Sequence, residues 1–339
     1  MTTPFADSTS GSIAHPSALC HAARQLSSSG EFPAVCMTKE FVIAVSPGYI
    51  RSGTLFYRLG KVDGMRSKVE WQDENKIELD GHCAFPSVAA TSEGVILLAY
   101  VKNKTTCHYI VGNLRRVGNQ VEWSHSTLID DGKNISVGLH IGEGNILTAV
   151  LAFVSGVNRG YTRVGVLDPR QKAIKWKGEK QEISNASNFR EVSIAISPSK
   201  DIVVAYRLGL FQPQLYSQIG KLTTASEPSP DDQCIEFHSE RSNANLLYGF
   251  HPSITINQQG QVMWMYQSIA GRKIMLHTGI IQSTGLSGGI DWKDDGVADH
   301  IDYGCYPAVS LTDTGIFIEI HGTNLGTSLF YRVGMLGLE

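Results

Sequence analysis

The chain of 339 residues has little charge and lacks any long apolar segment. Charged residues make up 18% of it, and the formal net charge is only -3. Because no basic stripe is present, this balance argues against a protein that binds nucleic acid or an anionic membrane surface. No apolar run of about 18 residues occurs either, so we expect no membrane-spanning helix.

Cysteines are few and widely scattered, and none belongs to a C-x-x-C pair. The six are Cys20, Cys36, Cys83, Cys107, Cys234 and Cys305. This spacing favours reduced thiols over a disulfide framework or a zinc site. The N-terminus has neither the basic nor the apolar region of a secretory signal, which predicts a cytoplasmic protein. Residues 1–12 are expected to form a flexible arm.

Short motifs that would reveal a cofactor or a catalytic centre are also missing. The sequence contains no H-E-x-x-H, no D-x-D-x-D-G calcium loop, no G-x-S-x-G and no P-loop. It has no S-x-D-x-G-x-T-W box and no W-D repeat. We therefore expect no metal, nucleotide or other cofactor.

What the chain does contain is a repeat, which is clearest in its last stretch, Tyr306–Gly334. Three runs with strand character, Pro307–Leu311, Ile316–His321 and Ser328–Val333, are separated by T-D-T-G and G-T-N-L-G-T, which are typical turn sequences. This pattern predicts a three-stranded antiparallel meander. The same meander recurs along the chain, which predicts a repeat protein.

Two markers fix the register of six units. A glycine that closes the third strand recurs every 52 to 59 residues, at Gly60, Gly112, Gly165, Gly220, Gly279 and Gly334. A β-branched residue early in the first strand occurs at Val35, Val88, Val137, Val192, Ile254 and Val309. After each glycine but the last comes a short run with an aromatic residue, namely Trp71, Trp123, Trp176, Phe237 and Trp292, which predicts a fourth strand that packs between units.

The last unit lacks a fourth strand of its own, because only five residues follow Gly334. Counting back from Val35 by the spacing of the other units reaches Ala18, in an N-terminal segment with a suitable alternation. We therefore predict an all-β, six-bladed β-propeller of four-stranded antiparallel blades, with the ring closed by the N-terminal strand. The single domain covers 13–339, with blades at about 32–84, 85–133, 134–188, 189–249, 250–305 and 306–339 plus 13–31.

Positions expected on the top face differ from blade to blade, whereas the framework positions repeat. The position just before the innermost strand holds Phe32, Phe85, Asn134, Phe189, His251 and Tyr306. A position late in the second strand holds Val45, Leu98, Thr148, Ala205, Trp264 and Glu319. Two residues further on the chain has Pro47, Tyr100, Val150, Arg207, Tyr266 and His321.

Aromatic and ionisable residues gather in blades 4 to 6 at these positions, while blades 1 to 3 supply mostly apolar groups. This inequality predicts one asymmetric pocket at the mouth of the channel, of the make-up typical of a small-ligand site. The ligand-binding candidates are Tyr100, Phe189, Arg190, Glu191, Tyr206, His251, Trp264, Tyr266 and Tyr306. The phenylalanines before the innermost strands could equally plug the channel.

Three residues are candidates for catalysis if the protein is an enzyme. Arg207 departs from the repeat at its position, and would bind an anionic or carbonyl group or pair with Glu191 or Glu319. Glu319 and His321 would form an acid/base pair, or alternatively make structural hydrogen bonds.

The repeat unit reads, in chain order, F/Y-P-S/A-V, a glycine, Y-R-V-G-x-L and V-E-W. It resembles the repeats of lectin-type β-propellers, which are found in fungal and microbial defence and toxin-associated proteins. The resemblance covers essentially the whole chain and implies a glycan-binding propeller. Such proteins bind glycans through repeated sites on or between blades.

Two functions follow as expectations, with a protein-interaction scaffold as a third. The first is a lectin-like carbohydrate-binding protein with few competent sites, whose partner is a glycan. The second is a cofactor-independent cyclase, isomerase or lyase that acts on an apolar small molecule in the single pocket. The fold alone cannot choose between them.

Overall fold

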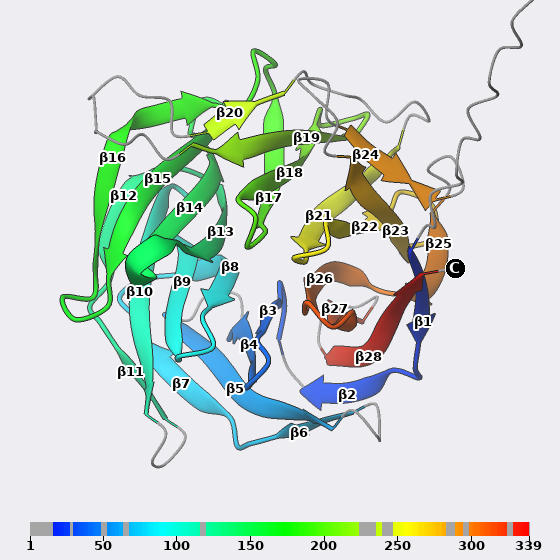
Figure 1. Cartoon of the computed structure of the whole chain (residues 1–339), viewed down its shortest axis with the longest axis horizontal. Helices are drawn as coiled ribbons and strands as arrows, with labels where there is room; N and C mark the ends of the chain where they lie inside the picture. Colours follow the sequence, from blue (N-terminus) through cyan, green and yellow to red (C-terminus); the bar gives the residue numbers. More distant parts are fainter. Residues whose placement is uncertain are drawn as a thin grey trace, which may run out of the picture.

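The computed structural model is a ring of six antiparallel sheets around a central axis (Figure 1). It describes residues 16–27, 30–48, 53–63, 68–115, 120–223, 235–238, 247–282, 289–293, 298–323 and 328–338. The predicted arm at 1–12, and Cys234, lie outside the described residues. None of the described residues form a helix that is long and apolar enough to cross a membrane.

Each blade has the predicted order of strands, running outward from the axis. The innermost strands are β3 (Ala34–Met37), β8 (Cys83–Ala90), β13 (Asn134–Ile141), β17 (Phe189–Ile196), β21 (Gly249–Ile256) and β26 (Cys305–Leu311). The second strands are β4 (Val42–Pro47), β9 (Val95–Lys102), β14 (Leu147–Val154), β18 (Asp201–Leu208), β22 (Gln261–Ser268) and β27 (Ile316–Gly322). The third strands are β5 (Thr54–Asp63), β10 (Thr106–Arg115), β15 (Gly160–Asp168), β19 (Gln214–Leu222), β23 (Lys273–Gln282) and β28 (Leu329–Leu338).

The outer layer of the blades contains more strands than the sequence predicted. The fourth strands are β6 (Lys68–Trp71), β11 (Gln120–Trp123), β16 (Ala173–Glu182), β20 (Ile235–Phe237), β24 (Gly289–Trp292) and β1 (Pro16–Cys20). In four blades a further segment pairs with the other end of the third strand, as β7 (Asn75–Glu78), β12 (Thr127–Asp131), β25 (Asp299–Tyr303) and β2 (Arg24–Ser27) do. A single turn of 3-10 helix, Glu143–Asn145, connects β13 to β14.

The ring closes as predicted, because β1 from the N-terminus pairs with β28 at the C-terminus. The register differs by two residues from the one that we counted. Gly334 lies opposite Cys20, whereas the equivalent Gly60 and Gly112 lie opposite Trp71 and Trp123. Cys20, and not Ala18, therefore occupies the aromatic position in the last blade.

The repeated glycine of the third strand and the repeated tryptophan of the fourth strand are in direct contact. A Cβ atom on Gly112 would lie 2.7 Å from the ring of Trp123, so only glycine leaves room for the indole above the third strand. The ring also reaches the neighbouring blade, where it meets Tyr57 edge-on with 5.6 Å between ring centroids. Trp71 and Trp176 make the same edge-on contact with Tyr331 and Tyr109. These tryptophans therefore pack between blades.

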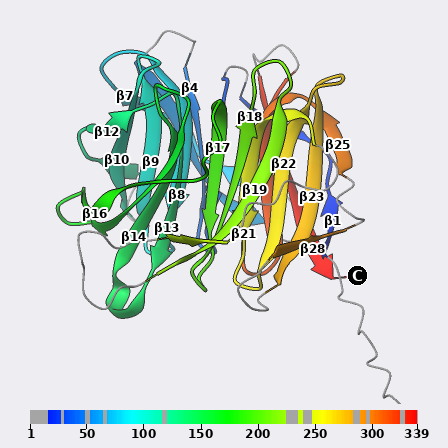
Figure 2. The ribbon, with the colours of Figure 1, turned by 90° about the horizontal axis from the view of Figure 1, so that it is seen from above.

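The core is divided into six apolar clusters, and each one lies between two neighbouring blades. Because blades cover both faces of the second strands, these strands are mostly apolar, as in the sequence V-I-L-L-A-Y-V of β9. The side view in Figure 2 shows the blades standing along the axis, with the C-terminus on the lower side. We call the opposite end, where the second and third strands are joined, the upper face.

The blades are also tied together next to the axis by serine hydroxyls. The backbone N–H groups of Val137, Ile194, Ile254 and Val309 donate to Ser87, Ser136, Ser193 and Ser253 of the preceding blade at 3.0 to 3.1 Å. These bonds define the equivalent positions of the blades in space. Ile194, and not Val192, is the equivalent of Val137 in blade 4.

This equivalence corrects the alignment of the top-face positions. Opposite the marker residues the second strands place Ala44, Leu98, Leu151, Val204, Trp264 and Glu319. Two residues later come Ser46, Tyr100, Phe153, Tyr206, Tyr266 and His321. The sequence alignment was wrong here in blades 1, 3 and 4. The second position is aromatic in five of six blades, so it is mostly a repeated framework position.

Candidate functional site

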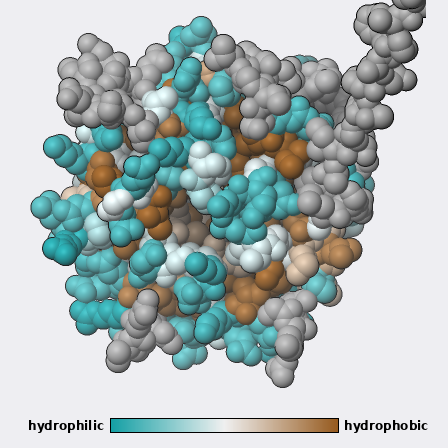
Figure 3. Space-filling model, in the orientation of Figure 1, coloured by the Kyte–Doolittle hydropathy of each residue, from teal (hydrophilic) through white to brown (hydrophobic). Residues whose placement is uncertain are grey.

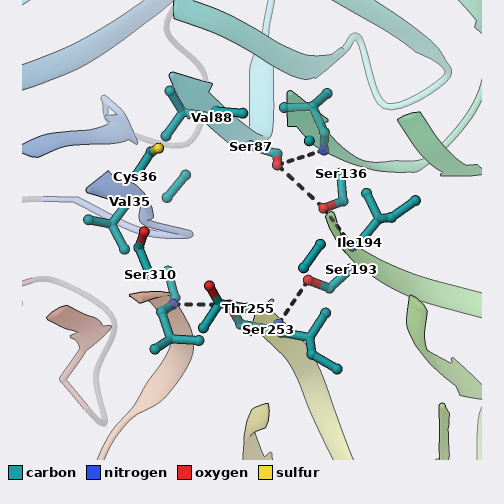
Figure 4. A pocket seen from close by; sticks show the side chains of 18 of the residues that line it. Val35, Cys36, Ser87, Val88, Ser136, Ser193, Ile194, Ser253, Thr255 and Ser310 are labelled. Atoms are coloured by element: carbon teal, nitrogen blue, oxygen red, sulfur yellow. Dashed lines mark hydrogen bonds between the residues drawn. The ribbon is translucent and has the colours of Figure 1, made fainter. Parts of the chain in front are cut away.

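Two cavities lie at the axis of the propeller. The first, of about 270 Å³, is the central channel, which the six innermost strands line with residues such as Ser87, Ser136 and Ser253 (Figure 4). In the orientation of Figure 1, the space-filling view is hollowed near the centre of the ring (Figure 3). The second, of about 500 Å³, lies at the upper ends of blades 1 to 4 and is called here the upper cavity.

An aromatic cluster at the upper end of the channel separates the two cavities. Phe32 lies 4.4 Å from Phe85 and 4.1 Å from Tyr306 between ring centroids, and Tyr306 lies 4.4 Å from His251. All four residues precede a proline and have a positive φ, between 44° and 56°. This uncommon backbone conformation is associated with an irregularity of the strand ladder in blades 2, 5 and 6.

Blades 3 and 4 do not contribute a ring to this cluster, which explains where the upper cavity lies. Their equivalent residues are Asn134 and Glu191. Each of these side chains accepts a hydrogen bond from the backbone of the next blade, Asn134 from Val192 at 2.9 Å and Glu191 from His251 at 2.7 Å. Because neither side chain extends across the channel mouth as a ring, space remains above them.

The sequence had assigned Phe189, and not Glu191, to this position. Counting three residues back from Ile194, the equivalent marker in blade 4, gives Glu191, whereas counting from Val192 gave Phe189. The Phe189 side chain is fully buried and stacks on Tyr206, with 4.8 Å between ring centroids. It forms part of the floor of the upper cavity.

Arg207 and Glu191 form a buried ion pair beside the upper cavity. The guanidinium donates from Nε to Oε2 at 2.8 Å and from Nη2 to Oε1 at 3.1 Å. Its Nη1 donates to the carbonyl of Gly209, and its Cζ lies over the Phe250 ring, 5.1 Å from the ring centroid. Nδ1 of His251 lies 3.2 Å from the same carboxylate. Both charged groups therefore already have protein partners.

Glu319 and His321 lie elsewhere, inside blade 6. Nδ1 of His321 lies 2.7 Å from Oε1 of Glu319, and its Nε2 lies 3.5 Å from Asp302, which pairs with Arg332. Burial opposes protonation of the ring, but the charges of Glu319 and Asp302 outweigh it and raise the pKa of His321. Glu319 is completely buried, and it lines neither cavity.

The structure thus distributes the predicted site residues over several places. Phe189, Arg190, Glu191 and Arg207 line the upper cavity. Glu191, His251 and Tyr306 line the upper end of the channel. The remaining candidates, Tyr100, Tyr206, Trp264, Tyr266, Glu319 and His321, are buried within blades and line neither cavity.

The buried phenols are held by local partners. The Tyr100 hydroxyl lies 2.6 Å from Oγ of Ser126, and burial raises the pKa of Tyr100 to about 12. The Tyr266 hydroxyl lies 3.4 Å from Nε2 of His277, and burial raises the pKa of Tyr266 to about 12 and lowers that of His277 to about 4. His277 is therefore neutral at pH 7.

Several residues that line the upper cavity were missed in the sequence. Lys104 and Asn158 belong to the loops between the second and third strands, and Lys133 precedes β13. Lys133 donates from Nζ to Oδ1 of Asn158 at 3.1 Å. The signal that would have found them is the position of these loops on the upper face, since the alignment compared only strand positions. Among the described residues, no group of three His, Cys, Asp or Glu could hold a metal ion.

The fold and the upper cavity define this chain as a six-bladed β-propeller with an asymmetric opening on its upper face. No protein-family profile and no curated protein sequence matches it.

Solved structures with a similar fold include the following three. Trypanosoma rangeli sialidase in complex with sialic acid has a TM-score of 0.55 at 11% identity, over 91% of this chain and 54% of that one. Penicillium chrysogenum alpha-L-arabinanase complexed with arabinobiose has a TM-score of 0.57 at 10% identity, over 94% and 98%. AofleA from Arthrobotrys oligospora has a TM-score of 0.54 at 10% identity, over 94% and 86%. The chain spans about half the length of the sialidase, and these identities show a shared fold alone.

Proposed function

We propose that the protein is a lectin-like carbohydrate-binding protein and that its glycan binds in the upper cavity. The observation that carries the proposal is the make-up of this cavity. Phe32 and Phe85 form one wall with partly exposed rings, and Lys104, Asn158 and Arg190 bring hydrogen-bond donors to the rest. An apolar wall beside a few polar groups suits a sugar ring, which has an apolar C–H face and polar hydroxyl edges.

Two further points support a carbohydrate ligand. A volume of about 500 Å³ lies within the range of small-ligand sites and would accept one or two sugar residues. Propellers of similar fold occur in complex with sialic acid and with arabinobiose. The same fold is therefore compatible with sugar ligands in other proteins.

Binding is better supported than the alternative of a single-pocket enzyme. The residues assigned to catalysis lie in separate blades, Arg207 in blade 4 and the Glu319–His321 pair in blade 6. Arg207 has its donors directed to Glu191 and Gly209. Neither Glu319 nor His321 lines the upper cavity.

The test is a glycan array followed by calorimetry with each sugar that binds. We expect one site per chain, and we expect Phe85→Ala to weaken binding roughly 10-fold, since it removes part of the apolar wall. Tyr303→Ala is the control, because Tyr303 is an exposed aromatic on β25 that lines neither cavity. Phe85→Leu and a thermal unfolding curve separate lost binding from lost folding. Equal affinity of wild type and both Phe85 variants would exclude this cavity as the glycan site.

A further inference from the structure

The upper cavity has an excess of positive charge. Of its described lining residues, Glu191 and Arg207 neutralise each other through two hydrogen bonds. Lys104, Lys133 and Arg190 then remain against the single carboxylate of Glu31. Cationic side chains that converge in a partly enclosed space attract an anionic ligand, because the surrounding apolar walls weaken screening by water.

Arg190 is the residue that most needs a ligand. It lies at the irregularity of β17, between Phe189 and Glu191, and its side chain lines the cavity. Its Nε atom is buried and has no hydrogen-bond partner among the described residues. An unpaired donor is unfavourable, and a ligand oxygen that reaches the guanidinium from the cavity would supply an acceptor.

Arg207 shows what such a partner looks like in the same cavity. Its guanidinium binds a carboxylate through Nε and Nη2 in the bidentate geometry that arginine favours. Arg190, on the neighbouring strand of the same blade, offers the same fork of donors without a protein carboxylate to receive it. The two arginines therefore differ in that a described residue supplies the acceptor to only one of them.

We propose that the ligand of the upper cavity is a saccharide that carries a carboxylate, and that Arg190 binds this carboxylate. The inference rests on the proposed function and adds the class of glycan. The precedent for a carboxylate is Glu191, which binds Arg207 through two hydrogen bonds in the same cavity. The ring of the saccharide then packs on Phe32 and Phe85, beside Lys104.

The experiment measures affinity for pairs of ligands that differ only in this charge. Glucuronate and sialic acid are each titrated against their methyl esters, and benzoate is included as a carboxylate without a sugar. We expect each acid to bind about 10- to 100-fold more tightly than its ester in low salt. The ratio of the two affinities should fall in 0.5 M NaCl, because salt screens the attraction between the carboxylate and the cationic side chains.

Variants then assign the effect to one side chain. Arg190→Gln should abolish the preference for acid over ester, whereas Arg190→Lys should retain part of the preference. Arg170→Gln is the matched control, because Arg170 is exposed in the loop between β15 and β16. Unfolding temperatures of all variants show whether the fold is intact.

The outcomes separate this inference from the proposed function. Equal binding of acids and esters by the wild type would overturn the inference and leave carbohydrate binding standing. A preference that survives Arg190→Gln would overturn the role of Arg190. Binding of benzoate that depends on Arg190, with no saccharide bound, would support the carboxylate site and overturn the proposed glycan ligand. If neither saccharides nor benzoate bind, both are overturned.

Discussion

Blades 4 and 6 each bury a carboxylate next to a histidine, and the two arrangements differ in how completely the charge is satisfied. Both oxygens of Glu191 in blade 4 are engaged, by Arg207 and by the backbone and ring of His251. Glu319 in blade 6 is more deeply buried, yet its Oε2 has no partner among the described residues. A carboxylate with both oxygens hydrogen-bonded is held in place next to the cavity. A buried carboxylate oxygen without a partner instead lowers the stability of the folded blade.

The two histidines respond in opposite directions. Burial and the positive charge of Arg207 lower the pKa of His251, although Glu191 opposes them. The charges of Glu319 and Asp302 outweigh burial and raise the pKa of His321. The balance between burial and the nearby charges therefore sets the direction in which the pKa of each imidazole moves.

The largest effect is expected from removing the cation of the saturated pair. Arg207→Leu leaves the carboxylate of Glu191 buried with only His251 as a partner, which should lower the free energy of unfolding by about 3–5 kcal/mol. Urea denaturation measures this loss. Arg170→Leu, at an exposed position, should change stability by less than about 0.5 kcal/mol. A loss below about 1 kcal/mol for Arg207→Leu would mean that the pair is not a structural element of blade 4.

A smaller effect of opposite sign is expected from replacing the half-satisfied pair by the residues of the repeat. The positions of Glu319 and His321 hold Leu98 and Tyr100 in blade 2. The double variant Glu319→Leu with His321→Tyr removes both charges, and Asp302 keeps Arg332 as its partner.

We expect this double variant to be equally stable or up to about 3 kcal/mol more stable than the wild type, since apolar replacements of buried pairs often stabilise. Urea denaturation compares it with the single variant His321→Tyr, which leaves the Glu319 carboxylate without its imidazole partner and should lose stability. A double variant less stable by more than about 2 kcal/mol would show that the pair supports blade 6.

The smallest effect is a difference in titration. Followed by NMR, His251 should titrate below the ordinary histidine pKa of 6.5 and His321 above it. His321 therefore contributes stability that is complete below pH 6.5 and is lost as the pH rises through its folded pKa. His251 acts in the opposite sense, and its contribution is lost as the pH falls through its lowered pKa. Titration of both rings on the same side of 6.5 would contradict the comparison.

The architecture was predictable because each blade repeats the same local solution. Gly112 and Trp123 occur together in the sequence since the indole needs the space that a side chain would fill, and the same pair marks other blades. The missing fourth strand after Gly334 indicated closure of the ring from the N-terminus, which β1 confirms. Those features depend on spacing along the chain, and spacing is visible in a sequence.

The candidate site was less predictable, because it depends on irregularities that spacing does not reveal. Counting along the sequence assigned Arg207 to the position near the end of the second strand that is compared between blades. The strand pairing assigns Tyr206 to this position, where most other blades also have an aromatic residue. A shift of one residue moves a strand side chain to the opposite face, so the misalignment changed which residues were compared. Lys104, Lys133 and Asn158 could not be assigned without the loops in space.

The sequence by itself determined the number of blades, the order of strands within each blade and the way the ring closes, since local propensity and repeat spacing encode them. Only the tertiary structure decided which carboxylate pairs with Arg207 and where the upper cavity lies, at the upper ends of blades 1 to 4. It also decided that the channel is capped by Phe32, Phe85, His251 and Tyr306. These outcomes arise from backbone irregularities and from contacts between residues that lie far apart in the chain. Asn134 and Glu191 leave the opening because their side chains bind the next blade.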